Sequence, residues 1–227
     1  MNEDSSILLP CDIRERQKTA MATGTTSERV YDAIRERLTD RTLRPGDKID
    51  PVELARTFGS SVTPVRDALH ILIGQGLAGT GIGEGFYVPH IDEPGLRDLY
   101  DWNIDLLLAT LRRQSRIHEE PDPLPRQPGD LPRRTAELFA TIARRSGSRE
   151  HSLAMRWANA RLASVRLVEQ GVLEGAVQEI DALSDAVALH DTAAIKRIVT
   201  IYHARRKRAA GNIIYALYRG GGNVPAI

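Results

Sequence analysis

Cysteine and long hydrophobic runs are nearly absent from this sequence. Cys11 is the one cysteine among 227 residues, so an internal disulfide and a cysteine-based metal site are both excluded. Stretches such as Leu106–Leu111 are far shorter than the roughly 18 apolar residues that a membrane-spanning helix requires. No apolar signal-peptide core precedes a small-residue cleavage site. These absences predict a cytoplasmic protein that does not enter a membrane.

The sequence also has almost no net charge, because 31 basic and 30 acidic residues leave +1. Residues 1–25 hold 3 basic and 4 acidic residues, residues 26–90 hold 8 and 9, and residues 91–227 hold 20 and 17. Any nucleic-acid binding must therefore depend on where individual cations lie. With 41% hydrophobic and 27% charged residues, the composition is that of a globular protein, and the length fits one domain or two small ones.

The N-terminal part is predicted to be a mobile arm followed by an amphipathic helix. Residues 1–25 show no apolar period and precede a helix-start signal. The spacing from Thr25 to Glu28 is that of a capping box, and the apolar stripe that follows predicts a helix ending near Thr42. The proline and glycine of Arg44–Asp47 then indicate a turn.

Two shorter helices are predicted next. Asp50 is an N-cap residue before Pro51 at the first helical position, and Gly59 ends this second helix. Thr63 is expected to cap a third helix that begins at Pro64. Two helices joined by a short turn are the geometry with which many proteins read DNA.

Beyond the third helix the pattern indicates a β-hairpin. Glycines recur at every second position from Gly79 to Gly85 and are followed by Phe86-Tyr87-Val88. Three helices and a terminal hairpin predict a winged helix-turn-helix domain over residues 26–90.

From Pro94 onward the periodicity is helical and no strand pattern reappears. We therefore expect a mostly α protein whose residues 91–227 form an all-α helical bundle, with a proline-rich loop at His118–Pro132. The basic run Arg205–Arg208 is spread around its helix and is expected to be a solvated, acid-paired helix end. The predicted helices lie near residues 94–116, 132–146, 149–170, 172–190 and 191–218.

The segment of residues 26–90 resembles the winged-helix domain of the GntR family of bacterial transcription regulators. An all-helical second half of this size resembles the FadR subfamily, also described as FCD-like, whose C-terminal domain dimerises and often holds an effector or a metal. The motifs that carry the resemblance are the turn Leu43–Gly46, the helix end Leu54–Gly59, the stretch Ser61–Leu72, the pair Gly76-Leu77 and the wing Gly83–Val88.

The resemblance implies that DNA is contacted at the start of the third helix and at the wing. Hydroxyls and a helix N-terminus donate to phosphate, and an arginine there reaches guanine in the major groove. For Arg66 the alternative is a solvated charge or an ion pair with Asp67 or Glu53. The implied DNA-binding residues are Ser61, Val62, Thr63, Arg66 and Gly83.

Three positions depart from the family pattern and remove cationic contacts. Val62 stands where the family usually has arginine, Val52 where some members have one, and Glu84 where the wing is basic or neutral. Each lost phosphate contact flattens the salt dependence of binding by about 0.9. We therefore expect weaker or differently specified DNA binding, in which Val62 packs against a thymine methyl group.

The metal site of the FadR subfamily is not expected in this chain. The four ligand positions fall on Thr135, Phe139, Ile180 and His203, and a single histidine does not hold a divalent metal. No cofactor is predicted.

Polar residues that interrupt the apolar faces of the bundle are candidates for binding an anionic or hydroxylated small molecule. These candidates are Asn103, Asn159, Arg161 and His203. For Arg161 the alternative is a surface position with the stem along apolar neighbours, and for His203 it is a partly buried or solvated histidine.

The sequence thus predicts a homodimeric transcription regulator, a repressor, that binds a near-palindromic double-stranded operator and responds to a small-molecule effector. The alternative is a sensor or interaction protein built on the same fold whose DNA contacts have decayed. An enzyme is not predicted, because the sequence has no G-x-S-x-G motif, no P-loop and no other local catalytic signature.

Overall fold

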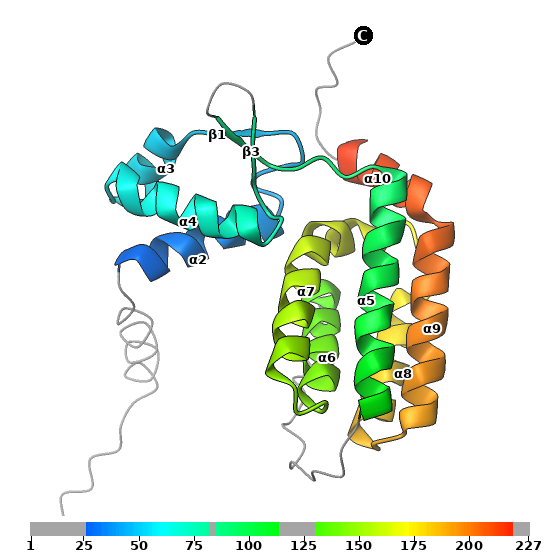
Figure 1. Ribbon diagram of the computed structural model, residues 1–227. Helices are drawn as coiled ribbons and strands as arrows, with labels where there is room; N and C mark the ends of the chain where they lie inside the picture. The colour runs from blue at the N-terminus through cyan, green and yellow to red at the C-terminus, as the bar shows by residue number, and fades with distance from the viewer. Residues whose placement is uncertain (1–25, 82–84, 114–129, 220–227) are drawn as a thin grey trace, which may run out of the picture.

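The computed structural model describes residues 26–81, 85–113 and 130–219. The arm predicted at residues 1–25, the wing residues Gly83 and Glu84, and residues 118–129 of the predicted loop lie outside this part of the chain. Figure 1 shows a small N-terminal domain beside a taller bundle of helices, with the last helix at the end of the bundle nearest the connection between the two.

The N-terminal domain is a winged helix-turn-helix, as predicted. Its strands form one antiparallel sheet in the order β1-β3-β2, with Lys48 opposite Tyr87 in β1 and β3. The hairpin prediction is confirmed, whereas strand β1 was not predicted because two residues are too few to show a period. The elements are α2 (Thr26–Thr39), β1 (Lys48–Ile49), α3 (Pro51–Phe58), α4 (Val62–Gly74), β2 (Gly79–Thr80) and β3 (Phe86–Tyr87).

Two predicted helix boundaries in this domain are wrong. Helix α2 ends at Thr39 and not near Thr42, because Arg41 takes the left-handed conformation with φ 68° and breaks the helix. Helix α4 begins at Val62, with Ser61 and not Thr63 as its N-cap residue. The proline at position 64 does not prevent the earlier start, because the first N–H groups of a helix have no intrahelical partner.

The second domain is all-helical in its described part (Figure 1). The predicted helix 191–218 is two helices, because the backbone leaves the helical conformation at Ala209, where φ is −90° and ψ is 5°. The elements are α5 (Glu93–Arg113), α6 (Leu131–Arg144), α7 (Arg149–Glu169), α8 (Ala176–Ala188), α9 (Thr192–Arg208) and α10 (Ala210–Arg219).

Three hydrophobic clusters hold the molecule together. One lies within the winged-helix domain, one fills the bundle between α5, α6, α7, α8 and α9, and one joins α10 to α5 and α7. Among the described helices none has a stretch that is long and apolar enough to cross a membrane.

Contacts across the domain boundary come from α7 and α10. Ala160 of α7 packs against the core of the winged-helix domain. The Arg41 guanidinium donates to the Leu217 carbonyl oxygen at 2.7 Å, and His90 Nδ1 lies 3.3 Å from the Tyr218 hydroxyl. The two domains therefore meet along packed side chains as well as through the connecting chain.

Candidate DNA-binding surface and polar interior of the helical domain

The turn between α3 and α4 is fixed by backbone geometry. Gly59 ends α3 in the left-handed conformation with φ 60°, and the Ser60 N–H donates back to the Ala55 carbonyl oxygen at 2.9 Å. Glycine adopts this conformation without a steric penalty. The chain therefore leaves α3 sharply and enters α4 after three residues.

The N-terminus of α4 is open to an anion. Ser61 makes no side-chain capping bond, and the first turn of α4 contains no acidic residue. Helix α3 differs, because the Asp50 carboxylate accepts from the Val52 N–H at 2.8 Å. The first N–H groups of α4 and the positive end of its dipole are thus available to a phosphate.

Ser61, Thr63 and Arg66 are exposed at this helix start. Within the described residues the Arg66 guanidinium has no ion pair and no hydrogen bond, so neither Asp67 nor Glu53 pairs with it. An exposed arginine without an internal partner is free to reach a phosphate or a base edge.

Val62 is less available than the other residues of this set. Its side chain is half-buried and packs against the core of the winged-helix domain. Val52, in contrast, is 51% exposed at the start of α3. Gly83, the wing residue that the sequence assigns to DNA contact, lies outside the described residues.

The sequence reasoning missed further polar groups on this side of the domain. His70 is exposed one helical turn after Arg66, and its ring lies edge-on to Phe86 of the wing at 5.4 Å between centroids. The spacing of four residues could have identified His70. Lys48 is exposed on β1 beside the wing, but only the sheet pairing places it there.

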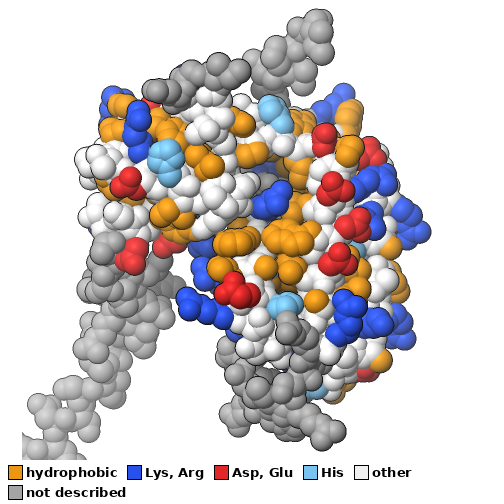
Figure 2. All heavy atoms as spheres, in the orientation of Figure 1, with side chains coloured by type: hydrophobic (Ala, Val, Ile, Leu, Met, Phe, Trp, Pro, Cys, Tyr) orange, Lys and Arg blue, Asp and Glu red, His pale blue; other side chains and the backbone are white. Residues whose placement is uncertain are grey.

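The charged side chains do not form one broad basic surface on the face seen in Figure 2. Acidic and basic side chains are intermixed along the right-hand side of the helical domain, and hydrophobic side chains gather in the middle over α7 and α5. This face therefore offers no broad attraction for a nucleic acid, in keeping with the near-neutral charge of residues 26–90.

In the helical domain, His203 is completely buried at 0% exposure, which corrects the expectation of a partly buried or solvated side chain. Its Nδ1 lies 2.7 Å from the Val199 carbonyl oxygen and its Nε2 lies 2.9 Å from Asn103 Oδ1. Burial lowers the pKa of the imidazole to about 3, and the nearby guanidinium groups of Arg206 and Arg166 act in the same direction. His203 is therefore neutral at physiological pH.

The positions that the resemblance assigns to metal ligands do not fit a metal. The Thr135 hydroxyl donates to the Leu131 carbonyl oxygen at 2.8 Å, and Phe139 stacks on His203 with 5.7 Å between ring centroids. Ile180 is a buried core residue. Among the described residues no group of three or more His, Cys, Asp or Glu side chains could hold a metal ion.

The four predicted effector residues do not form one site. Asn103 and His203 pair with each other, and Asn159 donates to the Ala136 carbonyl oxygen at 2.9 Å. Arg161 takes the alternative given for it, a surface position. It is exposed, with its guanidinium 5.9 Å from the centroid of the Trp102 ring.

An arginine that the sequence reasoning did not select occupies the interior. Arg166 is only 2% exposed and donates to Asn159 Oδ1 at 3.0 Å from one terminal nitrogen. It lies seven residues, or two helical turns, after Asn159 on α7, so the two share a face. That spacing could have identified Arg166 from the sequence as a neighbour of Asn159.

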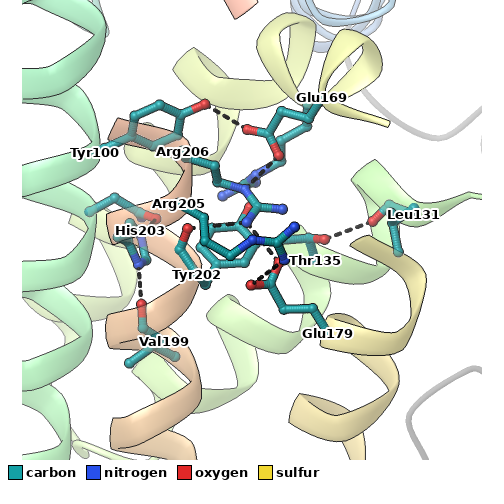
Figure 3. A network of polar contacts seen from close by, with 12 residues as sticks. Tyr100, Leu131, Thr135, Glu169, Glu179, Val199, Tyr202, His203, Arg205 and Arg206 are labelled. Carbon is teal, nitrogen blue, oxygen red and sulfur yellow. Dashed lines mark hydrogen bonds and ion pairs between the residues drawn. The ribbon is translucent and has the colours of Figure 1, made fainter. Parts of the chain in front are cut away.

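A second buried arginine belongs to an ion-pair network, shown in Figure 3. The guanidinium of Arg206 is 1% exposed and donates to Glu169 at 2.7 Å and to Glu179 at 2.8 Å. The Tyr100 hydroxyl donates to Glu169 at 2.7 Å, and burial raises the pKa of this hydroxyl well above its usual range. The prediction that the run Arg205–Arg208 pairs with acidic residues is confirmed. The prediction that the run is solvated is wrong for Arg206.

Comparison with known proteins finds similarity in the N-terminal domain. Residues 26–88 match the model of the family described as bacterial regulatory proteins, gntR family. The Nta operon transcriptional regulator of Aminobacter aminovorans is 40% identical over 69 residues, which are 30% of this chain and 33% of that protein. The HTH-type transcriptional regulator YdhC of Bacillus subtilis (strain 168) is 28% identical over 76 residues, 34% of each chain. The chain thus matches about a third of the length of these curated relatives.

Solved structures share the architecture of both domains. A GntR-type protein from Rhodococcus sp. RHA1 has a TM-score of 0.64 at 17% identity, covering 81% of this chain and 96% of that one. E. coli McbR/YncC has a TM-score of 0.57 at 17% identity, covering 87% of this chain and all of that chain. At this identity the likeness shows the fold, a GntR-type winged helix-turn-helix followed by a helical domain. The matched family and the named curated relatives are transcriptional regulators, not enzymes.

Proposed function

We propose that this protein is a DNA-binding transcriptional regulator of the GntR family, whose helix α4 reads operator DNA. The open N-terminus of α4 beside the exposed and unpaired Arg66 is the observation that carries the proposal. The Ser61 and Thr63 hydroxyls and the helix N–H groups hold a phosphate, while the guanidinium reaches a guanine edge in the major groove. The wing around Gly83 adds a backbone contact.

The helical domain serves for dimerisation and effector binding in this proposal. Residues 26–90 form the DNA-binding unit, and residues 91–227 form the helical unit. Two copies place their α4 helices in successive major grooves of a near-palindromic operator, because a two-fold dimer matches a two-fold site. The protein acts as a repressor, and a small-molecule effector changes its DNA affinity by preferring one dimer geometry.

A sensor without DNA binding is the second candidate, and the valines at positions 52 and 62 favour it. Both valines replace cations that would contact phosphate, and residues 26–90 hold 8 basic and 9 acidic residues. Against this candidate, the one cation near the start of α4, Arg66, forms no ion pair within the described residues. Lost contacts of this kind reduce salt dependence and affinity without removing the reading helix.

Fluorescence anisotropy with labelled DNA separates the two candidates. The probe is the fragment upstream of the protein's own gene, titrated at two salt concentrations with wild type, Arg66→Ala and Arg97→Ala. Arg97 is the matched control, because it is an exposed arginine of the helical domain paired with Glu93. We expect Arg66→Ala to bind about tenfold more weakly or worse, since a base-reading arginine contributes about 1–3 kcal/mol, and Arg97→Ala to bind as wild type.

Two results would contradict the regulator. One is equal DNA binding by wild type and Arg66→Ala. The other is no binding by wild type to this fragment or to a library of random operator sequences, which would favour the sensor.

A further inference from the structure

The last turn of α10 contacts the winged-helix domain and the segment that connects β3 to α5. The Tyr218 hydroxyl donates to the Ile91 carbonyl oxygen and accepts from the Ile91 N–H, both at 3.1 Å, and it lies 3.3 Å from His90 Nδ1. The Arg41 guanidinium donates to the Leu217 carbonyl oxygen at 2.7 Å. One turn of helix thus holds both the connecting segment and the loop between α2 and β1.

Helix α10 is itself a fixed part of the helical domain. Ala210, Ile213 and Leu217 are buried in a hydrophobic cluster that they share with side chains of α5 and α7, and Tyr218 packs against this cluster. The Leu217 carbonyl belongs to the last turn, whose C=O groups have no N–H partner within the helix and can accept from a guanidinium. The apolar face therefore anchors α10, and polar atoms of its last turn hold the neighbouring segments.

The loop between α2 and β1 is shaped for this contact. Arg41 takes the left-handed conformation with φ 68°, which is uncommon for a residue other than glycine. Gly46 has φ 92°, and a Cβ atom added there would collide with the His90 ring. The Gly46 N–H donates to the Val88 carbonyl oxygen at 2.8 Å. The loop and the connecting segment therefore form one unit in front of α10.

Helix α7 supplies a second contact between the domains, at a different place. Ala160 packs against the core of the winged-helix domain. A Cβ atom added at Gly76, two residues after the end of α4, would lie 3.4 Å from Arg161 Nε. One contact would leave a pivot between the two domains, whereas two separate contacts fix the angle between them.

We propose that Tyr218 and Arg41 are positioning residues for DNA reading, which hold the winged-helix domain at one angle to the helical domain. The two α4 helices of a dimer then match the spacing of two half-sites. This inference rests on the regulator of the proposed function. A dimer binds its second half-site at an effective concentration that depends on how well its two reading helices match that spacing. Loosening the angle therefore weakens binding to the whole operator and not to one half-site.

Tyr218→Phe tests the inference with a small change. It removes the hydroxyl that bonds both backbone groups of Ile91 and keeps the ring that stacks on His90. Arg41→Met is the second variant and acts from the other side of the same contact. The matched control is Tyr215→Phe, because Tyr215 is 57% exposed on the same helix and its hydroxyl has no hydrogen bond among the described residues.

Fluorescence anisotropy compares the operator with a fragment that holds a single half-site. We expect Tyr218→Phe and Arg41→Met to bind the operator about tenfold more weakly and the half-site as wild type does, because avidity contributes about 10²- to 10⁴-fold. One base pair inserted between the half-sites shifts one of them by about 3.4 Å and rotates it by about a tenth of a turn. The insertion should weaken wild type strongly and the two variants much less, which a general loss of stability would not produce.

Distances between the domains test the inference without DNA. Spin labels at Glu36→Cys on α2 and Val177→Cys on α8, both exposed positions, report the distance by double electron–electron resonance in a chain that carries Cys11→Ser. Labelled protein is diluted into excess unlabelled protein, so that the measured pairs lie within one chain. We expect one narrow distance distribution for wild type and the control, and a broader distribution for the two variants.

Two results would overturn the inference. One is a distribution in Tyr218→Phe and Arg41→Met as narrow as in wild type, which would mean that α7 alone holds the winged-helix domain. The other is an equal loss of affinity for the operator and the half-site, which would mean that these residues do not act through the domain angle. A wild type that binds no DNA contradicts the regulator alone, because the distance measurement decides the positioning contact independently.

Discussion

The two domains differ in where their polar side chains lie. The first exposes them at its surface, and the second buries several of them in its interior. The winged-helix domain buries only apolar side chains among its described residues, and its Ser61, Thr63, Arg66 and His70 are exposed. The helical domain buries all nine of the polar or charged residues that are inaccessible in the described part of the chain. These residues are Asn103, Thr110, Thr135, Asn159, Arg166, Glu169, Ser184, His203 and Arg206.

This difference is consistent with the two ligands of the proposed function, DNA for the first domain and a small molecule for the second. A polymer with a charged backbone can be bound only at a surface, so the groups that contact it must be exposed. A small molecule can be enclosed, and enclosure makes each hydrogen bond and charge more effective because water is excluded. Three arginines show the contrast. Among the described residues, Arg66 is exposed and forms no ion pair, Arg206 is buried and paired with two carboxylates, and Arg166 is buried and forms no ion pair with a carboxylate.

The largest effect is expected from breaking the buried ion pairs. Replacing Glu169 by Leu removes one of the two carboxylates that compensate Arg206 and leaves Tyr100 without its acceptor. We expect the free energy of unfolding to fall by about 3–5 kcal/mol, as for other buried pairs that lose one partner. Urea unfolding followed by circular dichroism measures this change.

The matched control for Glu169→Leu is Asp32→Asn in the other domain. Its exposed pair with Arg35, at 3.5 Å, should contribute no more than about 0.5 kcal/mol. Similar losses in the two variants would mean that the two domains do not differ in the way proposed.

A medium effect is expected from pH. His203 has a folded pKa of about 3 against an ordinary value of 6.5, so the unfolded chain binds the extra proton between these values. The contribution of the neutral His203 to the free energy of unfolding is fully present above pH 6.5 and is lost as the pH falls toward 3. Between about pH 7 and pH 5 we expect the free energy of unfolding to fall by about 2 kcal/mol from this residue.

Urea unfolding of wild type and His203→Gln at a series of pH values isolates the part of the pH dependence of stability that comes from His203. The variant lacks the titrating group, so its stability should depend less steeply on pH over that range. Equal slopes in the two proteins would show that His203 is not a buried neutral histidine.

The smallest effect on stability is expected from adding a cation to the DNA-binding surface. Val62→Arg places a guanidinium at the open start of α4, and the stem of the arginine can follow the apolar surface that the valine covers. We expect the slope of log affinity against log salt to steepen by about 0.9, which corresponds to one more phosphate contact. Stability should change by no more than about 1 kcal/mol.

Ile71→Arg is the control for Val62→Arg, because Ile71 is 55% exposed near the other end of the same helix. It adds the same charge away from the helix start and should leave the salt slope closer to that of wild type. An equal steepening in both variants would indicate general attraction and not a contact at the N-terminus of α4.

The sequence predicted the winged-helix domain more completely than the interior of the bundle. Pro51 and Gly59 mark the ends of a helix by local backbone preferences, which do not depend on distant residues. The predicted cap at Thr63 failed because Ser61 and Thr63 are both good capping residues, and the turn geometry selected the first.

In the bundle, the apolar period identified helices but did not show which polar residues meet. Asn103 and His203 are a hundred positions apart and lie in contact. Arg161 and Arg166 are five positions apart on one helix, yet one is exposed and the other is 2% exposed. Arg161 takes the surface position that was its alternative, because one helix face packs on other helices, and the sequence did not say which residues lie on that face.

The sequence by itself determined the order of helices and wing and the change from a winged helix-turn-helix to an all-helical part, because apolar periodicity and short-range steric and hydrogen-bonding preferences decide these features. The tertiary structure alone decided that Arg66 remains free, that Arg206 is neutralised by two carboxylates and that Arg166 is buried without one. Burial and charge compensation depend on segments far apart in the chain, and only packing brings those segments together.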